Sequence, residues 1–177
     1  AYLRAFREAE GVSGPVDVAL LESLAREQAM TSLFVTGPVT IKMASGNGAT
    51  PEQAADKALE ATLGAVIRIV QQGSRDTIVE TVKRDREALG FARVTDGKPC
   101  AFCAMLASRG AVYKSRGTAD FKPHDRCGCQ PEPVYSDSDH KIPGRAAEFA
   151  ALWEESTQGY SGKDAINAFR RAYNAER

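Results

Sequence analysis

Apolar residues recur along this chain at intervals of three and four, which is the spacing of amphipathic helices. The longest such series comprises Leu59, Leu63, Val66, Val70, Ile78, Val82 and Leu89. Its start carries a capping box, in which Thr50 caps the helix, a proline takes the first helical position, and Gln53 follows three residues after the cap. The pattern predicts one long helix, or two in line, over about 51–89. A glycine inside a helix costs about 1 kcal/mol relative to alanine, so we expect any break near Gly73.

Shorter amphipathic stretches lie on both sides of the long helix. They predict helices at 2–9, at 16–33, from Pro143 through Thr157, and again after a Ser161 cap. The segment 35–43 is different, because it is rich in β-branched residues and is interrupted by Gly37-Pro38. That composition predicts an extended arm or an edge strand.

After Gly90 the helical rhythm gives way to short elements joined by loops. We expect a strand at 91–95, a helix at 101–108, a second strand at 111–113, and an extended edge at 127–135 that contains Pro131 and Pro133. This stretch has few apolar residues for a core of its own. A bound metal would supply the stability that so small a core lacks.

These elements predict a predominantly helical α+β fold, with long amphipathic helices around a small, loop-rich α+β module. The expected segments are the N-terminal helices and arm at 1–49, the long helix at 50–89, the module at 90–135, and a polar hinge at 136–139 that opens the C-terminal helices at 136–177. The chain begins without methionine and already in helical rhythm, so we expect it to be a piece of a longer protein.

The amino-acid composition limits the classes of molecule that we expect the chain to bind. The 177 residues are 43% hydrophobic and 26% charged, which is ordinary for a folded globular protein. Lysine and arginine number 23, as do aspartate and glutamate, so no overall positive field attracts nucleic acid and any such contact must be local. No apolar run approaches the roughly 18 residues of a membrane-spanning helix. We therefore expect no membrane partner.

All four cysteines and one of the two histidines fall within 30 residues of one another, in a C-x₂-C pair followed by H-x-x-C-x-C. Thiolates and imidazole are the ligands that Zn²⁺ prefers. Cys100 and Cys103 form the first pair. Cys127 and Cys129 point the same way in an extended segment and would complete a Cys₄ site. Alternatively His124 replaces one of them, most simply Cys127, so four of these five residues form the predicted metal site.

Other uses of the cluster stay open. In an oxidising setting the four cysteines would form two disulfides, and they could also be reduced thiols without metal. A catalytic zinc needs an acid–base partner, but the residue two past His124 is Arg126 and no H-x-E motif exists. A third possibility is a catalytic pair in which Cys103 is the nucleophile and His124 or His140 is its base. Metal binding is the simpler explanation, because it also accounts for the other cysteines. We therefore assign no catalytic residue and expect a structural zinc and no enzyme activity.

The cysteine motifs resemble a known family signature. The stretch Arg93–Gly110 with its C-x₂-C, then Val112-Tyr113, then His124-x-x-Cys127-x-Cys129, is similar to the carboxy-terminal signature of the Mu F-like minor head proteins of tailed phages. Three flanking segments, Tyr2–Glu10, Thr36–Pro38 and Ala168–Tyr173, resemble the version carried by phages and prophages of actinobacteria.

The resemblance implies a minor capsid protein near the portal vertex, acting in procapsid assembly and in DNA packaging or ejection. Its expected partners are the portal protein, the major capsid protein or both, with packaged DNA as a further contact and several copies in one assembly. The expected location is the virion head, and the bacterial host cytoplasm during assembly. Two alternatives are a capsid maturation protease, or another zinc- or cysteine-dependent hydrolase, and a zinc-stabilised protein-interaction module.

Overall fold

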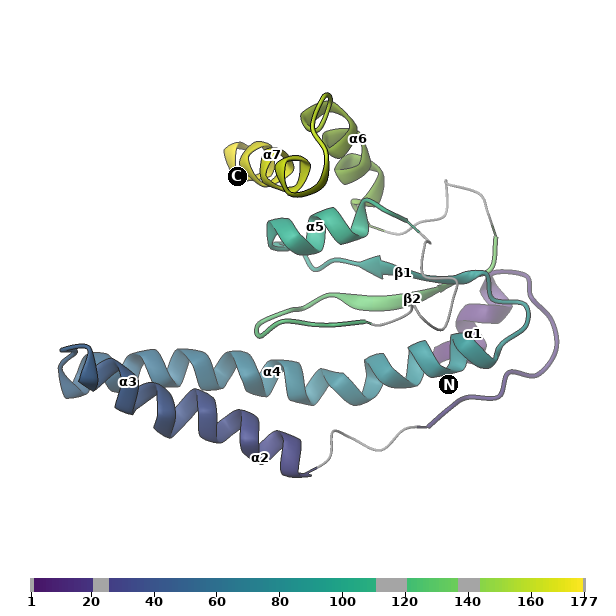
Figure 1. Ribbon diagram of the computed structural model, residues 1–177. Helices are drawn as coiled ribbons and strands as arrows, with labels where there is room; N and C mark the ends of the chain where they lie inside the picture. Colours follow the sequence, from purple (N-terminus) through teal and green to yellow (C-terminus); the bar gives the residue numbers. More distant parts are fainter. Residues whose placement is uncertain (1, 21–25, 111–120, 137–143, 177) are drawn as a thin grey trace. The chain divides into compact units, whose positions relative to one another are not determined.

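The computed structural model describes residues 2–20, 26–110, 121–136 and 144–176 (Figure 1). The chain divides into two compact units. The first unit comprises Ala1–Ala19, Thr77–Phe121 and Cys129–Arg177, and the second comprises Leu20–Asp76 and Lys122–Gly128. None of the described helices is both long and apolar enough to cross a membrane. The predicted fold class, a predominantly helical α+β protein, is confirmed, while the finer division into four segments stays a prediction.

The second unit is built on an antiparallel helical hairpin. Its first arm runs through α2 (Arg26–Phe34), the π-helical turn η1 (Val35–Val39) and α3 (Thr40–Gly46), and α4 (Pro51–Arg84) returns beside it (Figure 1). Arg68 on α4 donates from Nη2 to Ser32 Oγ at 2.6 Å. Nearer the turn, a Cβ built on Gly37 would lie 3.7 Å from Thr62 Oγ1. The hydrogen bond and the close approach of Gly37 show that the two arms lie against each other.

The predicted extended arm at 35–43 is wrong, because this segment is helical throughout. Proline has no N–H and clashes with the carbonyl four residues earlier in an α-helix, and the wider π turn around Pro38 accommodates it. Two threonine hydroxyls donate hydrogen bonds to backbone carbonyls of this segment. Thr36 Oγ1 donates to Ser32 O at 2.9 Å, and Thr40 Oγ1 donates to Val35 O at 3.1 Å. Packing in a hairpin overrides the strand preference of β-branched residues.

The predicted helix at 16–33 is wrong in its first part. Residues 16–20 are not helical, residues 21–25 lie outside the described residues, and the described helix α2 covers Arg26–Phe34. The backbone N–H of Ala19 donates to Thr81 Oγ1 of α4 at 3.0 Å, so its partner is a side chain distant in sequence. A local periodicity does not reveal such a long-range partner.

The long helix starts as its sequence predicts. Thr50 N donates to Gln53 Oε1 at 3.0 Å, and Gln53 N donates to Thr50 Oγ1 at 3.3 Å, which is the reciprocal pair of a capping box. α4 is one continuous helix that passes through Gly73 and ends at Arg84. It begins in the second unit and ends in the first.

The first unit joins a two-stranded sheet to helices. Its elements are α1 (Tyr2–Ala9), β1 (Gly90–Val94), α5 (Ala101–Ala107), β2 (Gln130–Val134), α6 (Ala146–Ser156) and α7 (Gly162–Ala175). The strands are antiparallel, with Gly90 opposite Val134 and Val94 opposite Gln130. Helix 2–9, strand 91–95, helix 101–108 and the proline-containing edge are thus confirmed.

Three predictions fall wholly or partly outside the described residues: the strand at 111–113, most of the hinge at 136–139, and the helix start at Pro143. In the described part, α6 begins at Ala146. Ser161 occupies the N-cap of α7 as expected, although its side chain makes no capping hydrogen bond.

The main core of the first unit lies among α5, α6 and α7. Its buried members are Ala104, Met105, Ala107, Phe149, Phe169 and Tyr173. The rings of Phe149 and Tyr173 meet edge to face at 5.9 Å, and Trp153 lies 5.5 Å from Phe169. Tyr173 OH donates to Pro99 O at 2.6 Å, which ties α7 to the segment just before α5. Trp153 is partly buried and packs against this core.

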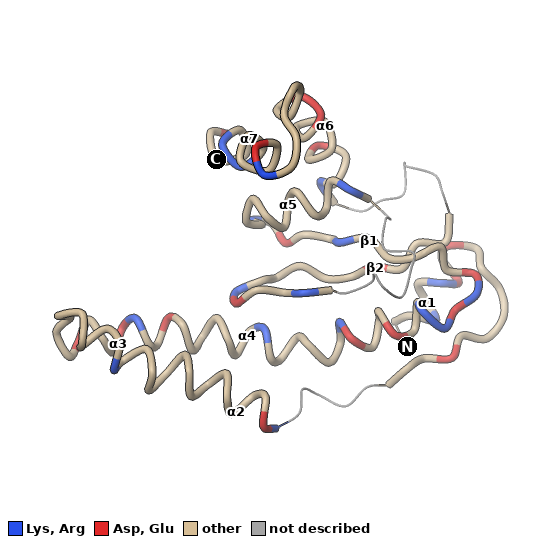
Figure 2. Tube along the Cα trace, in the orientation of Figure 1, with Lys and Arg blue, Asp and Glu red and all other residues tan. Residues whose placement is uncertain are grey.

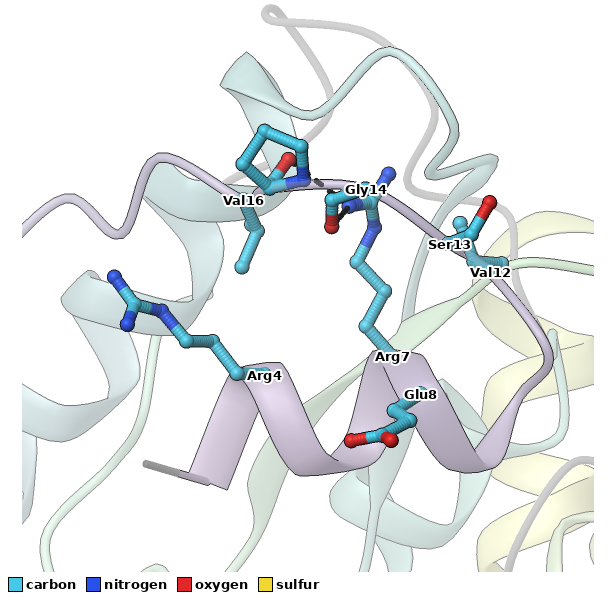
Figure 3. Close-up of a pocket in the computed structure, with 8 residues that line it drawn as sticks. Arg4, Arg7, Glu8, Val12, Ser13, Gly14 and Val16 are labelled. Carbon is cyan, nitrogen blue, oxygen red and sulfur yellow. Dashed lines mark hydrogen bonds between the residues drawn. The ribbon is translucent and has the colours of Figure 1, made fainter.

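A buried ion pair holds α1 in the first unit. Arg7 Nε lies 3.2 Å from Asp85 Oδ2, and Arg7 Nη1 donates to the carbonyls of Gly14 and Pro15 at 2.7 and 3.0 Å (Figure 3). Tyr135 OH donates to the same Asp85 oxygen at 3.1 Å. Burial, followed by the charge and hydrogen bond of Asp85, raises the pKa of Tyr135 to about 12.

Candidate metal centre

The C-x₂-C pair lies at the start of α5. Cys100 is the N-cap residue, with an extended backbone (φ −73°, ψ 160°), and its Sγ accepts a hydrogen bond from Cys103 N at 3.4 Å. Cys103 is in the first helical turn and is only 1% exposed, whereas Cys100 is partly exposed. The start of the helix therefore places the Sγ atoms of Cys100 and Cys103 close to each other. Bonds from backbone N–H groups to sulfur favour the thiolate that a metal requires.

The second motif forms a tight turn followed by a strand. Cys127 N donates to His124 O at 3.1 Å, and Arg126 has a φ of 64°, a left-handed conformation that non-glycine residues seldom adopt. Cys127 is 2% exposed and Cys129, one residue before β2, is 1% exposed. His124 is exposed, and its Nδ1 lies 2.6 Å from Asp125 O.

All five predicted ligands take part in two groups of metal-ligating atoms, and in each group the atoms lie within 4.8 Å of one another. One group consists of Cys100, Cys103 and His124, and the other of Cys103, Cys127 and Cys129. Zinc–sulfur bonds of about 2.3 Å in a tetrahedral arrangement place two ligand sulfurs about 3.8 Å apart. The separations within each group, all within 4.8 Å, are of that order, and Cys103 belongs to both groups.

The donor set fits a soft or borderline metal. It consists of thiols and one imidazole, whereas hard ions such as Mg²⁺ and Ca²⁺ take oxygen ligands. The group of Cys103, Cys127 and Cys129 is fully buried. In the other group, Cys100 is partly exposed and His124 is exposed.

Two carboxylates lie near these motifs in the sequence. Asp125 is paired with Arg68, whose Nε lies 2.7 Å from Asp125 Oδ1. Glu132 is three residues past Cys129 in an extended segment, so it lies on the opposite face of the strand. Its pKa is raised by burial and by the charge of Glu10. His140, the other predicted nucleophile partner, lies outside the described residues.

Helix α4 supports the turn that carries His124 and Cys127 through a glycine that the sequence analysis did not identify. Arg126 N donates to Gly64 O at 3.2 Å. A Cβ at Gly64 would lie 2.9 Å from Arg126 Cγ and 3.3 Å from Asp125 Cβ, both too close. Only glycine permits this approach. The sequence offers one indication of this contact, because a glycine inside a predicted helix often marks a place where another segment packs closely.

Charged side chains of α4 also hold the turn. Arg75 is fully buried, and its Nη2 donates to Cys127 O and to Gln71 Oε1, both at 2.5 Å. Arg126 Nη2 donates to Glu60 O at 2.9 Å and lies 3.5 Å from the carboxylate of the same residue. Nothing in the local sequence distinguishes Arg75 from a solvated helix arginine, so sequence reasoning missed it.

Comparison with known proteins identifies one family relationship. A family model described as VG15 protein matches residues 18–156, which include both cysteine motifs. Comparisons with curated proteins and with solved structures give no match.

Proposed function

We propose that this chain, which belongs to the VG15 protein family of phage-type proteins, is a minor capsid protein of a tailed-phage head. Within that group it is of the Mu F-like minor head type, because the C-x₂-C and H-x-x-C-x-C motifs match that signature. It acts near the portal vertex in procapsid assembly. Its partners are the portal protein, the major capsid protein or both, and packaged DNA is a further local contact.

The cysteine and histidine groups hold one structural Zn²⁺ in this proposal. Four of the five residues Cys100, Cys103, His124, Cys127 and Cys129 provide the ligands, and Cys103 belongs to both groups. The metal would supply a rigid cross-link between segments that are far apart in the sequence. The chain's own contribution is to hold the sulfurs in place, through the cap at Cys100 and the support of the turn by α4.

The observation that carries this proposal is the buried group of three cysteine sulfurs within 4.8 Å of one another. We assign a structural role because the donor set of both groups consists of thiols and one imidazole. A maturation protease would instead need an activated nucleophile, such as Cys103 with a nearby base.

Complementation of a phage that lacks this gene tests the assignment. The wild-type chain should restore DNA-filled heads in electron micrographs, and antibody labelling should place it at a single vertex. Cys103→Ser should fail, while Phe102→Ala, a half-exposed neighbour between the two motif cysteines, should succeed. Absence of the chain from purified virions would remove the capsid assignment. Loss of capsid-protein cleavage with Cys103→Ser, in heads that still assemble, would instead favour the protease.

A further inference from the structure

The hairpin of the second unit carries several exposed apolar side chains. On α4 these are Leu59, Leu63, Val66, Ile67 and Val70, with exposed fractions of 59, 54, 39, 43 and 75%. The exposed apolar residues of the first arm are Met30, Phe34, Val35, Ile41 and Met43, which are 43 to 63% exposed. We call the five α4 residues the hairpin surface.

The five α4 members form one stripe. With 3.6 residues per turn they fall within an arc of about 100°. Leu59, Leu63, Val66 and Val70 follow steps of four, three and four, which is the spacing of a coiled-coil seam. Arg68 lies on the other side of the helix, where it binds Ser32 and Asp125. The first arm is uncharged from 28 to 41, as Figure 2 shows by its colour.

We infer that the hairpin surface binds a second copy of this chain, with the two α4 stripes antiparallel. The area agrees with a small interface. At about 100 Å² of apolar area per large side chain, the five exposed α4 side chains offer about 270 Å² per copy. Two copies then bury about 540 Å² of apolar area, which is the apolar share of a weak interface of about 900 Å² in total.

The charges at the two ends of the α4 stripe favour an antiparallel pair of helices over a parallel pair. The helical positions that continue the stripe toward the amino terminus are Asp56 and Glu52, and those that continue it toward the carboxyl terminus are Ser74 and Thr77. A parallel pair would place the carboxylates of both copies together, which is unfavourable. An antiparallel pair places them against uncharged residues and also opposes the helix dipoles. A two-fold axis at the middle of the stripe sets Leu63 opposite Val66 of the other copy.

This inference concerns the hairpin alone and does not depend on the zinc or on the capsid assignment. The full chain, reduced and with equimolar zinc, is studied by sedimentation and light scattering between about 1 and 100 µM, the range that corresponds to micromolar dissociation constants. The parent should approach twice its mass of 19.0 kDa as the concentration rises. Val70→Glu should raise the dissociation constant at least tenfold without changing the circular dichroism, because the side chain is exposed.

Ile166→Glu on α7 is the matched control, since Ile166 is also a half-exposed apolar residue but lies outside the hairpin. It should leave the dissociation constant unchanged. A parent that stays monomeric throughout the range would overturn the inference. An equal effect of Ile166→Glu and Val70→Glu would also overturn it.

A mixing experiment tests the antiparallel pairing. Leu63→Glu and Val66→Lys should each weaken the homodimer, because each introduces a charge into the stripe. When the two variants are mixed, residue 63 of one copy meets residue 66 of the other, so native mass spectrometry should detect a heterodimer at concentrations where each variant alone is monomeric. Absence of that heterodimer would refute the antiparallel register.

Discussion

Replacement of Gly64 by alanine tests how α4 supports the metal-binding turn. In an isolated helix the change would stabilise by about 1 kcal/mol, because alanine is the better helix former. Here the new Cβ would lie 2.9 Å from Arg126 Cγ and 3.3 Å from Asp125 Cβ, and the second of these atoms is fixed directly to the backbone. The turn must therefore move away from the helix.

Two destabilising effects and one stabilising effect determine the expected change in the free energy of unfolding. Overpacking costs about 1–3 kcal/mol, and strain on the hydrogen bond from Arg126 N to Gly64 O costs about 1 kcal/mol more. After subtraction of the helix-forming gain, Gly64→Ala should lower the free energy of unfolding by about 1–3 kcal/mol. Zinc affinity should fall as well, since His124 and Cys127 belong to the turn that moves.

Urea unfolding followed by circular dichroism measures the first effect, and competition with a chromophoric chelator measures the second. Gly46→Ala on α3 is the control, because no atom lies within 4 Å of a Cβ at that position. It should be neutral or slightly stabilising, with unchanged zinc affinity. If Gly64→Ala stabilises the chain as much as Gly46→Ala does, the close approach of the turn to α4 is refuted.

Three further substitutions test other parts of the account. Arg75→Met should lower the free energy of unfolding by about 1–3 kcal/mol, because it leaves the buried carbonyl of Cys127 without this donor; an unchanged urea midpoint would contradict this. Tyr173→Phe should cost about 1–2 kcal/mol through loss of the bond to Pro99 O, and thermal unfolding compared with the wild type measures it. The pKa of about 12 at Tyr135 predicts a pH effect: above pH 10 the unfolded phenol ionises while the folded one keeps its proton, so stability falls as the pH rises toward 12. Tyr135→Phe should flatten that fall in pH-dependent urea titrations, and an identical slope in both proteins would refute the burial of the phenol.

Local signals in the sequence were enough to predict several elements. The reciprocal bonds between Thr50 and Gln53 form as the capping box predicts, because all the participating atoms lie within one helical turn. The strand at 91–95 and the proline-containing edge are also correct, since an edge strand accepts residues that lack an N–H. These predictions depend on neighbours in the sequence and need no knowledge of the tertiary fold.

The failures have a common cause, which is a partner distant in sequence. The β-branched segment around Pro38 becomes a π-helical turn because it packs in a hairpin against α4. Residues 16–20 stay non-helical, with the N–H of Ala19 bound to Thr81, 62 residues away. The support of the metal-binding turn by Gly64 and Arg75 likewise joins segments that are far apart, so motif spacing identifies the ligands but not the residues that hold them.

A structural zinc held by the cysteine and histidine groups can be measured by elemental analysis of the reduced full chain, together with unfolding before and after chelation. We expect about one zinc per chain and loss of cooperative unfolding on chelation. We also expect that Cys103→Ser abolishes binding, because Cys103 belongs to both ligand groups, while Phe102→Ala retains the metal. Two disulfides in the purified chain, or full stability without zinc, would contradict a structural zinc.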